Sequence, residues 1–243
     1  MRDEAEQIRQ VRRIFNQVVP VYDLLNRVLS LREDVRWRRF VARSLRLGAG
    51  ARVLDVATGT GDLALAVAGL PQKPLVVGLD LVPAMLGPAQ KKQRASGARL
   101  ALLAGDGTRL PFADATFDAV TIAFGIRNIP RRVAAMAEMR RVLKPGGRLY
   151  VLEFTAPQGR LVRAMYLRYL SRLLPWLGGM VSGDQASYRY LAETILEFPA
   201  PADFRREMAQ AGLITPRSHA LTRGIAWVHV AEKASAPPKT GRG

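Results

Sequence analysis

The segment VLDVATGTGDLALAVA, residues 53–68, decides the expected fold, because an apolar run typical of a buried strand leads through a glycine-rich turn into a helical stretch. Gly59 and Gly61 allow the backbone to turn sharply and to approach a ligand, and free N–H groups open the helix that follows. A glycine-rich turn is also a common plain connection between a strand and a helix. Its interpretation as a ligand site therefore depends on the rest of the chain.

Strand-like and helical stretches alternate beyond this segment. Strands are expected at 52–56, 75–80, 99–105, 117–124 and 147–154, and helices from Asp62, from about Pro83, and from about Arg131 to Leu143. Strands that alternate with helices form right-handed crossovers, which build a parallel, doubly wound sheet. Two more strand candidates, 213–220 and 225–231, are expected to complete the sheet edge.

This order divides the chain into five segments. We expect an N-terminal helical cap at 1–50, a cofactor-binding core at 51–157, a helical insertion over the substrate at 158–200, a C-terminal helix with edge strands at 201–232, and a disordered tail at 233–243. The insertion holds two longer helical stretches, 160–175 and 187–197.

Composition restricts the chemistry. The chain has 243 residues, 49% of them hydrophobic, which is enough to bury the core of one elaborated domain. It has no cysteine and only two histidines, His219 and His229, which excludes disulfides and thiolate catalysis and argues against a metal centre. The charged N-terminus and the lack of a long apolar run predict a cytoplasmic protein.

The net charge of +17 points to a polyanionic partner, which is either nucleic acid or the anionic face of a membrane. The basic residues are denser in the flanking segments 1–50 and 158–190 than in the middle of the chain. An arginine-rich surface that only keeps the protein in solution is an equally open interpretation.

Ligands of a doubly wound sheet bind beyond the carboxyl ends of its strands, so the residues that follow each strand are candidates. Asp80 closes the second strand 19 residues after Gly61, where a carboxylate can accept both hydroxyls of an adenosine ribose. Asp106 and Gly107 follow the third strand, where the adenine would lie, although Asp-Gly is also a common turn. The sequence GTGD lacks the third small residue of the dinucleotide fingerprint, which favours S-adenosylmethionine over NAD.

A family resemblance is carried by five blocks: VLDVATGTGD, GLDLVPAML, GDGTRLPFADATFDAVTIAFGIRN, MRRVLKPGGRLYVLEF and DQASYRYLAETILEFP. With RIFNQVVPVYDLLNRVLSLREDVRWRR, they resemble the ubiquinone/menaquinone biosynthesis C-methyltransferase family, UbiE/MenG type, in register from about Arg13 to about Gly224. The resemblance implies an α/β class I S-adenosylmethionine-dependent methyltransferase fold, with a Rossmann-like, mostly parallel sheet and an antiparallel edge strand.

The resemblance also implies an activity, the methylation of a ring carbon on a polyprenylated quinol. Demethylmenaquinol to menaquinol is the first choice, and a polyprenyl methoxybenzoquinol of ubiquinone biosynthesis is the alternative. Family cofactor contacts fall on the glycine turn at Thr60, on Asp80, on Asp106 and Gly107, and on Ala123 in the fourth strand. Two features depart from the family: serine is common where Ala123 stands, and the tail reads RGIAWVHV.

Arg127 and Asn128 end the stretch TIAFGIRN, at the ligand edge of the fourth strand. Carbon methylation of a quinol needs electron density from a phenolic oxygen, and a fixed cation favours the phenolate. We therefore hypothesise that Arg127 stabilises the developing oxyanion or positions a water, and that Asn128 orients the ring. An arginine that only anchors a loop carboxylate is the alternative. The sequence shows no clear base beside Arg127.

Family segments that fold over the site supply further candidates. Tyr22, in PVYDLLN, is a candidate ring contact, and a Tyr-Asp pair that only packs and caps a helix is the alternative. Asp184, Tyr188 and Tyr190, in DQASYRY, are candidates for substrate binding. The stretch at 160–175 mixes arginines with leucines and tyrosines, which suits either an amphipathic helix on an anionic membrane or a lid packed on the core.

Two other classes of function stay open, an RNA methyltransferase and a cofactor-binding scaffold. An RNA methyltransferase would explain the charge, but no motif for exocyclic amines and no cysteine nucleophile is present. A scaffold that binds the cofactor without turnover is disfavoured by the intact glycine turn and FGIRN block. A cation-dependent O-methyltransferase is disfavoured because no carboxylate cluster is evident. Prenyl length and a possible homodimer are not determined by the sequence.

Overall fold

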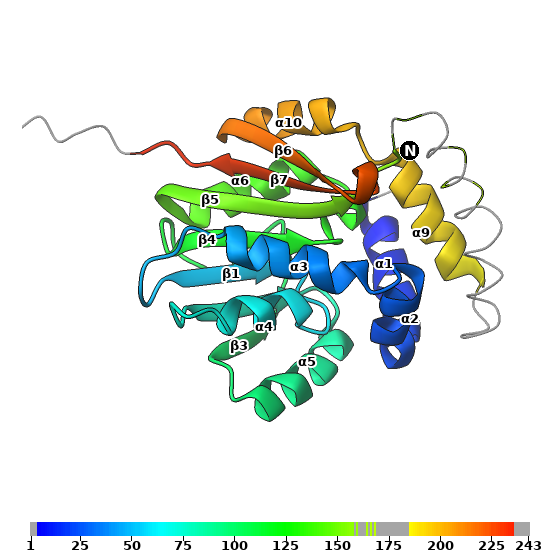
Figure 1. The fold of residues 1–243 in the computed structure, drawn as a ribbon, viewed down its shortest axis with the longest axis horizontal. Coiled ribbons are helices and arrows are strands. Elements are labelled where there is room, and N and C mark those ends of the chain that lie inside the picture. Colours follow the sequence, from blue (N-terminus) through cyan, green and yellow to red (C-terminus); the bar gives the residue numbers. More distant parts are fainter. Residues whose placement is uncertain are drawn as a thin grey trace, which may run out of the picture.

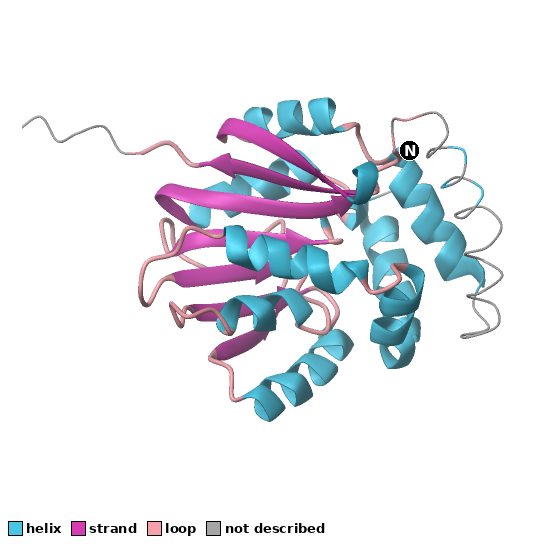
Figure 2. Ribbon diagram, in the orientation of Figure 1, coloured by secondary structure: helices cyan, strands magenta, loops and turns pink. Residues whose placement is uncertain are grey.

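A seven-stranded sheet forms the centre of the computed structural model, which describes residues 4–157 and 185–235 together with residues 159, 164, 166 and 168. Its strand order is β3-β2-β1-β4-β5-β7-β6 (Figures 1 and 2). The strands are β1 (Arg52–Val56), β2 (Leu75–Asp80), β3 (Leu100–Ala104), β4 (Phe117–Ala123), β5 (Leu143–Phe154), β6 (Ile214–Leu221) and β7 (Ala226–Glu232).

Strand direction creates the ligand edge. β1 pairs in parallel with β2 and β4, β2 with β3, and β4 with β5, whereas β7 is antiparallel to both β5 and β6. The chain order reverses between β1 and β4, and the carboxyl ends of such neighbouring strands are where doubly wound sheets bind ligands. The predicted parallel sheet with an antiparallel edge is confirmed.

Helices cover both faces of the sheet. One face buries α3 (Glu33–Ser44) and α4 (Asp62–Ala68), for example through Trp37, Val41 and Leu63. The other face buries α6 (Arg132–Val142) and α10 (Pro201–Gln210) through Met136, Met139 and the fully buried Phe204. α5 (Pro83–Ser96) packs against β3 and β2 at the sheet edge. Because α3 joins the sheet core, the segment 1–50 contributes to the core as well as to the cap.

Three helices lie beyond the carboxyl ends of the parallel strands, at the right of Figure 1. They are α1 (Glu4–Val18), α2 (Tyr22–Leu29) and α9 (Gln185–Glu197), and the short turn Val19–Val21 links the first two. This arrangement places residues from both flanks of the chain over the edge at which β1 and β4 diverge. The expected strands and helices of the core agree with the structure to within a few residues, apart from β5, which starts at Leu143. Most of the predicted helix 160–175 lies outside the described residues, as do tail residues 236–243.

His229, in β7, is a buried core residue. Its side chain has no solvent exposure, its Nδ1 lies 2.7 Å from Ser218 Oγ, and its ring packs against Phe204. Burial, with a smaller effect of Arg205, lowers the pKa of His229 from 6.5 to about 3. The imidazole is therefore neutral in the folded protein at neutral pH.

This lowered pKa makes stability depend on pH. Below about pH 6.5 His229 binds a proton in the unfolded chain, whereas in the folded chain it stays neutral down to about pH 3. The free energy of unfolding therefore decreases as the pH falls from about 6.5 towards 3. Between about pH 7 and about pH 5 the loss amounts to about 2 kcal/mol. Asp55 has the opposite effect on stability. Burial raises its pKa to about 6, so its protonation stabilises the folded protein as the pH falls through this value. We expect His229→Leu to remove the loss, measured as the difference in unfolding free energy between the two pH values; equal slopes in both proteins would refute the assignment.

Candidate active site

An open cavity lies at the carboxyl ends of the central strands. Its volume is about 810 Å3 when the solvent-filled entrance is included. Seven of the predicted site residues line it: Tyr22, Gly59, Asp80, Asp106, Gly107, Ala123 and Asn128. The helix α1 forms one of its walls through Ile8, Val11 and Phe15.

The glycine turn forms the floor of the cavity. Gly59 and Gly61 have φ of +57° and +82°, in the left-handed region where a Cβ would be strained. A Cβ on Gly59 would point towards Met85 and the Tyr22 ring, at 3.5 and 3.9 Å. The turn is thus kept free of side chains directly beneath Tyr22. Gly61 precedes α4 and does not line the cavity.

Asp80 ends β2 with a buried carboxylate. Its Oδ2 accepts the N–H of Gly59 at 2.7 Å, and its Oδ1 accepts the N–H of Val82 at 2.8 Å. Burial raises the pKa of Asp80, and these two hydrogen bonds partly oppose the rise. A carboxylate has about four acceptor positions, so each oxygen can still accept a hydroxyl from a ligand in the cavity.

The loop after β3 forms a second polar part of the wall. Asp106 Oδ1 accepts both the N–H and the hydroxyl of Thr108 at 2.8 Å, which fixes the carboxylate in a tight turn. Gly107 packs on the sheet, because a Cβ there would lie 3.0 Å from Val56 Cγ1. Ala123 lines the cavity and offers no side-chain donor or acceptor.

These features fit S-adenosylmethionine. The buried Asp80 suits the ribose hydroxyls, and the apolar side chains of Val82, Met85 and Ile129 offer a surface for an adenine ring. The Gly59 turn leaves room for close approach of the methionyl part. In the part of the chain that the structure describes, no group of three or more His, Asp or Glu side chains could hold a metal ion.

Thr60 is not among the residues that line the cavity, and its hydroxyl bonds to side chains of α2 and α5. Thr60 Oγ1 donates to Asp23 Oδ1 at 2.6 Å and accepts from Lys92 Nζ at 3.1 Å. Lys92 also forms ion pairs with Asp23 and Asp62, at 2.5 and 2.6 Å. These contacts fasten α2 to the glycine turn and to α5, so they hold Tyr22 over the cavity. A cofactor contact through the Thr60 side chain stays a prediction.

Arg27 makes a second connection between α2 and the turn. Its Nη2 lies 3.1 Å from Asp62 Oδ2. Burial would raise the pKa of Asp62, but Arg38, Lys92 and Arg27 together hold it below its usual value. The carboxylate at the start of α4 therefore stays ionised, and both links to α2 persist at neutral pH.

Asp23→Asn tests the role of this connection. We expect the variant to need a several-fold higher concentration of S-adenosylmethionine for half-maximal turnover, because α2 and Tyr22 are held less firmly. Stability should change by less than about 1 kcal/mol, since the pair is partly exposed. Asp203→Asn, at an exposed ion pair of α10, is the control. An unchanged half-saturation in Asp23→Asn would show that the connection does not position Tyr22.

Arg127 pairs with a buried carboxylate. Its Nη1 donates to Glu153 Oε1 and to the Phe124 carbonyl, both at 2.6 Å, and its side chain is 7% exposed. Glu153 has no exposure and also accepts the N–H of Phe154 at 2.9 Å. The anchoring alternative considered from the sequence is therefore the contact that the structure contains. Arg127 is not among the residues that line the cavity, and its predicted direct contact with the acceptor stays a prediction.

Asn128 lies in the cavity wall and contacts α9. Its Oδ1 accepts the Tyr190 hydroxyl at 3.2 Å, and both side chains are buried. The structure thus brings two candidates from distant segments together, although Tyr190 is not among the lining residues. Tyr188 belongs to α9, but its side chain is not among those that the structure describes. Asp184 lies outside the described residues altogether.

Sequence reasoning missed three residues at this edge. Glu153 lies within an apolar strand, Lys92 lies on a helix far from the glycine turn in sequence, and Asp55 precedes the turn. The Asp55 carboxylate accepts the hydroxyls of Thr58 and Thr121 at 2.7 and 2.6 Å, which joins the turn to β4. A charged residue inside an apolar run is the only signal that could have indicated Glu153.

A methyltransferase family matches nearly the whole chain in sequence. The model of the ubiE/COQ5 methyltransferase family matches residues 1–233. The chain belongs to this family. The predicted family and the predicted class of enzyme, a methyltransferase, are therefore confirmed.

Curated relatives resemble the methyltransferase over nearly its whole length. A protein of Thermus thermophilus named demethylmenaquinone methyltransferase is 46% identical over 220 residues, which cover 90% of this chain and 100% of the relative. A protein of Geobacter sp. named ubiquinone/menaquinone biosynthesis C-methyltransferase UbiE is 43% identical over 232 residues, covering 94% and 98%.

Solved structures confirm the fold of the methyltransferase. A protein of Thermotoga maritima, described as a SAM-dependent methyltransferase and possible histamine N-methyltransferase, superposes with a TM-score of 0.65. It is 19% identical, and the match covers 91% of this chain and 99% of that one. At this identity the likeness shows a shared fold and says nothing about the methyl acceptor.

Proposed function

We propose that this enzyme methylates a ring carbon of a polyprenylated quinol, with demethylmenaquinol as its acceptor and menaquinol as its product. S-adenosylmethionine is its methyl donor and supplies an electrophilic methyl group. The observation that carries the proposal is the cavity that joins Asp80 and the glycine turn to Asn128, Tyr22 and an apolar wall. A nucleoside and a flat aromatic ring would both find matching surfaces there.

The reaction balances without a redox partner. A ring carbon of the quinol would form a bond to the methyl group as the carbon–sulfur bond of the sulfonium breaks, with the electron pair staying on sulfur. S-adenosylhomocysteine would be released, and the hydrogen on the methylated ring carbon would leave as a proton. The chain must therefore favour electron release from a phenolic oxygen and keep water from competing. In this proposal Asn128, whose Oδ1 accepts the Tyr190 hydroxyl, hydrogen-bonds a hydroxyl on the ring and so orients it.

Arg127 supports this step through its charge. Glu153 fixes the guanidinium, and Arg127 Nε is buried without a hydrogen-bond partner among the described residues. Because Arg127 does not line the cavity, we propose that the guanidinium acts through its charge on the oxygen that becomes negative, or through one water bound to Nε. The paired geometry fits a preorganised cation, which need not move when charge develops.

The relatives support the choice of acceptor. The Thermus thermophilus relative is named for demethylmenaquinone, whereas the Geobacter relative is named for both quinone pathways. A methoxybenzoquinol is therefore the second candidate. Neither the cavity nor the family gives support to RNA as acceptor.

Competition between acceptors tests the proposal. Labelled S-adenosylmethionine is incubated under reducing conditions with equal concentrations of a short-chain demethylmenaquinol and a short-chain methoxybenzoquinol, and total RNA is tested separately. We expect label in the naphthoquinol first. Preference for the benzoquinol would assign the enzyme to ubiquinone synthesis. Label in RNA alone would refute the proposal.

The long apolar tail of such an acceptor places it in a bilayer. No helix in the described part of the chain is long and apolar enough to cross a membrane. We therefore propose that the enzyme works from the cytoplasm and docks peripherally on the anionic inner face of the membrane. A homodimer stays an open prediction, for which measurement of the mass in solution is the test.

A further inference from the structure

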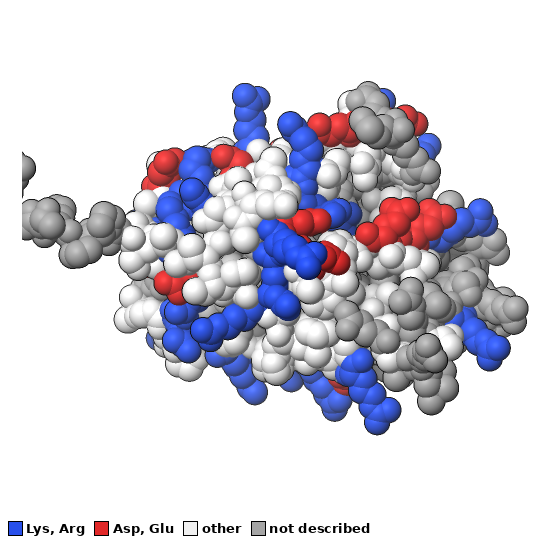
Figure 3. All heavy atoms as spheres, turned by 90° about the horizontal axis from the view of Figure 1, so that it is seen from above, with Lys and Arg blue, Asp and Glu red and all other residues white. Residues whose placement is uncertain are grey.

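The outward face of α3 carries a stripe of arginines. Arg36, Arg39 and Arg43 are spaced three and four residues apart, so they share one face of the helix, and Arg32 precedes them. All four are exposed. In the space-filling view, basic side chains project from much of the edge of the molecule, while acidic ones gather in a few places (Figure 3).

The carboxylates of α3 neutralise only one arginine of this stripe. Glu33 pairs with Arg36, and Asp34 is buried against Arg38. Among the residues that the structure describes, Arg32, Arg39 and Arg43 have no ion-pair partner. Three positive charges, two on one face of α3 and one directly before the helix, are therefore available to an anionic partner.

Exposed apolar side chains precede this stripe in the chain. Leu24 and Val28 lie one turn apart on α2 and are 57% and 48% exposed, and Leu31, in the turn to α3, is 86% exposed. Leu31 and Arg32 have φ of +50° and +64°, which bend the chain sharply at this point. Large apolar side chains this exposed beside unpaired arginines are the composition of an interfacial surface.

We propose that the α2–α3 surface, formed by Leu24, Val28 and Leu31 with Arg32, Arg39 and Arg43, docks on an anionic lipid bilayer. The arginines contact the headgroups, and the apolar side chains of α2 enter the boundary with the acyl chains. This inference rests on the proposed function for its purpose, because α2 also carries Tyr22 in the cavity wall. Docking through α2 would bring the cavity close to a substrate dissolved in the membrane.

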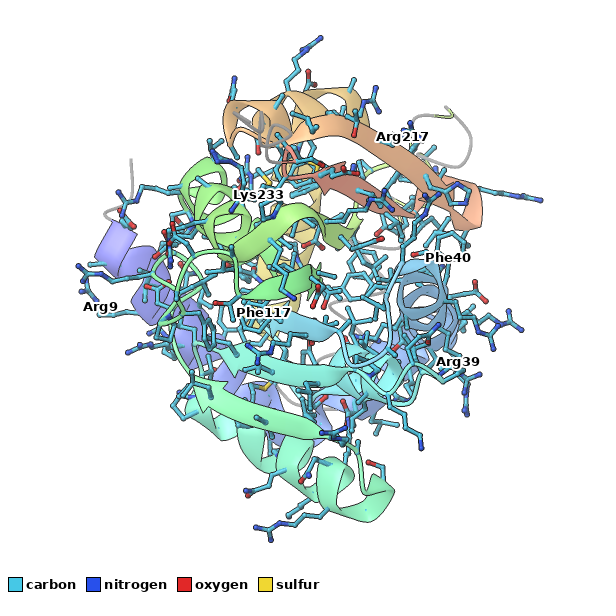
Figure 4. All side chains as sticks on the ribbon, turned by 90° about the vertical axis from the view of Figure 1, so that its left-hand side faces the viewer. Arg9, Arg39, Phe40, Phe117, Arg217 and Lys233 are labelled. Carbon is cyan, nitrogen blue, oxygen red and sulfur yellow. The ribbon has the colours of Figure 1, made fainter. Side chains whose placement is uncertain are left out.

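Another basic surface of the same chain provides a comparison. α1 exposes Arg9, Arg12 and Arg13, but none of the large apolar side chains with high exposure lies on α1. Figure 4 shows Arg9 and Arg39 on opposite sides of the molecule. Nucleic acid would be attracted by either set of arginines and would gain nothing from exposed leucines, so the apolar side chains favour a membrane.

Co-sedimentation with vesicles tests the surface. Vesicles of equimolar phosphatidylcholine and phosphatidylglycerol are compared with vesicles of phosphatidylcholine alone. We expect the wild type to bind only the anionic vesicles, and the triple variant Arg32→Gln, Arg39→Gln, Arg43→Gln to bind about a hundredfold more weakly. Vesicle binding by the triple variant equal to that of the wild type would overturn the proposal.

The α1 triple variant Arg9→Gln, Arg12→Gln, Arg13→Gln is the matched control, because it removes the same charge. We expect it to weaken vesicle binding far less. Equal loss in the two triple variants would mean that net charge alone attracts the protein, and no surface would be assigned. Loss of binding to duplex RNA in the α3 triple variant, with vesicle binding retained, would assign the surface to nucleic acid and overturn the proposal.

Leu31 tests insertion independently of charge. Leu31→Gln should weaken vesicle binding about tenfold. The chain has no cysteine, so Leu31→Cys can carry a single environment-sensitive dye, with Asn16→Cys on α1 as the control position. We expect a blue shift on anionic vesicles at position 31 only. No shift at Leu31→Cys, or the same shift at both positions, would refute insertion at the turn between α2 and α3.

Turnover in detergent separates this inference from the proposed reaction. With a short-chain demethylmenaquinol in detergent micelles, the α3 triple variant should turn over at the wild-type rate. Absence of turnover in the wild type would refute the proposed function and leave vesicle binding as a separate result. Loss of turnover in the α3 triple variant alone would mean that these arginines support the site itself, contrary to the proposal.

Discussion

Asp80→Asn is expected to weaken the binding of S-adenosylmethionine about a hundredfold or more, measured by isothermal titration calorimetry. Two charge-assisted hydrogen bonds to a ribose are lost, and each is worth about 1.5–3 kcal/mol. The asparagine has only one oxygen, whereas the carboxylate accepts N–H groups from both Gly59 and Val82. One backbone donor therefore loses its acceptor, and the glycine turn loosens as well.

The control for this prediction is the same change from aspartate to asparagine at a position outside the cavity. Asp203→Asn removes an exposed carboxylate on α10 and should bind the cofactor like the wild type. Thermal unfolding of Asp80→Asn separates a local defect from global unfolding. Near-normal cofactor affinity in a folded Asp80→Asn would show that the ribose does not lie at the end of β2.

Arg127 and Glu153 must be changed together for a clear result. Arg127→Ala alone leaves the Glu153 carboxylate buried without its partner, and we expect a loss of about 3–5 kcal/mol of stability. A lower activity of Arg127→Ala would then reflect the loss of folded protein and would not reveal the role of the arginine in the reaction. The double variant Arg127→Met, Glu153→Gln removes both charges and should recover most of that stability, as measured by urea unfolding.

Activity of the double variant decides the role of the pair. If Arg127 stabilises the developing phenolate, kcat should stay about 10²–10³-fold below the wild type even in the stable double variant. The half-saturating concentration of S-adenosylmethionine should change little, because Arg127 does not line the cavity. Wild-type kcat in the double variant would assign the arginine a purely structural role.

Local sequence signals were sufficient for the core of the fold. Apolar runs bounded by glycine, proline and aspartate marked the strands, because a strand buried on both faces needs an apolar side chain at nearly every position. Asp80 and Asp106 were found for a related reason. A carboxylate directly after such a run must lie at the sheet edge, where parallel strands bring their ends together.

Contacts between distant elements could not be predicted in this way. The pairing of Arg127 with Glu153 depends on β4 and β5 being neighbours, with Ala123 opposite Leu152. Lys92 reaches Asp23 only because α2 and α5, which are distant in the sequence, come close together in the fold. Thr60 was predicted as a cofactor contact from its place in the turn, whereas the position of α2 determines that its hydroxyl faces Asp23.

The position of the transferred methyl group tests the central claim most directly. The enzyme is incubated with a short-chain demethylmenaquinol and S-adenosylmethionine that carries ¹³C in the methyl group, under reducing conditions, and the product is examined by NMR. Carbon methylation predicts one new aryl-methyl signal coupled to the quinol ring. A methoxy signal, or label that never reaches the quinol although S-adenosylmethionine is bound, would contradict the assignment of this site to quinol C-methylation.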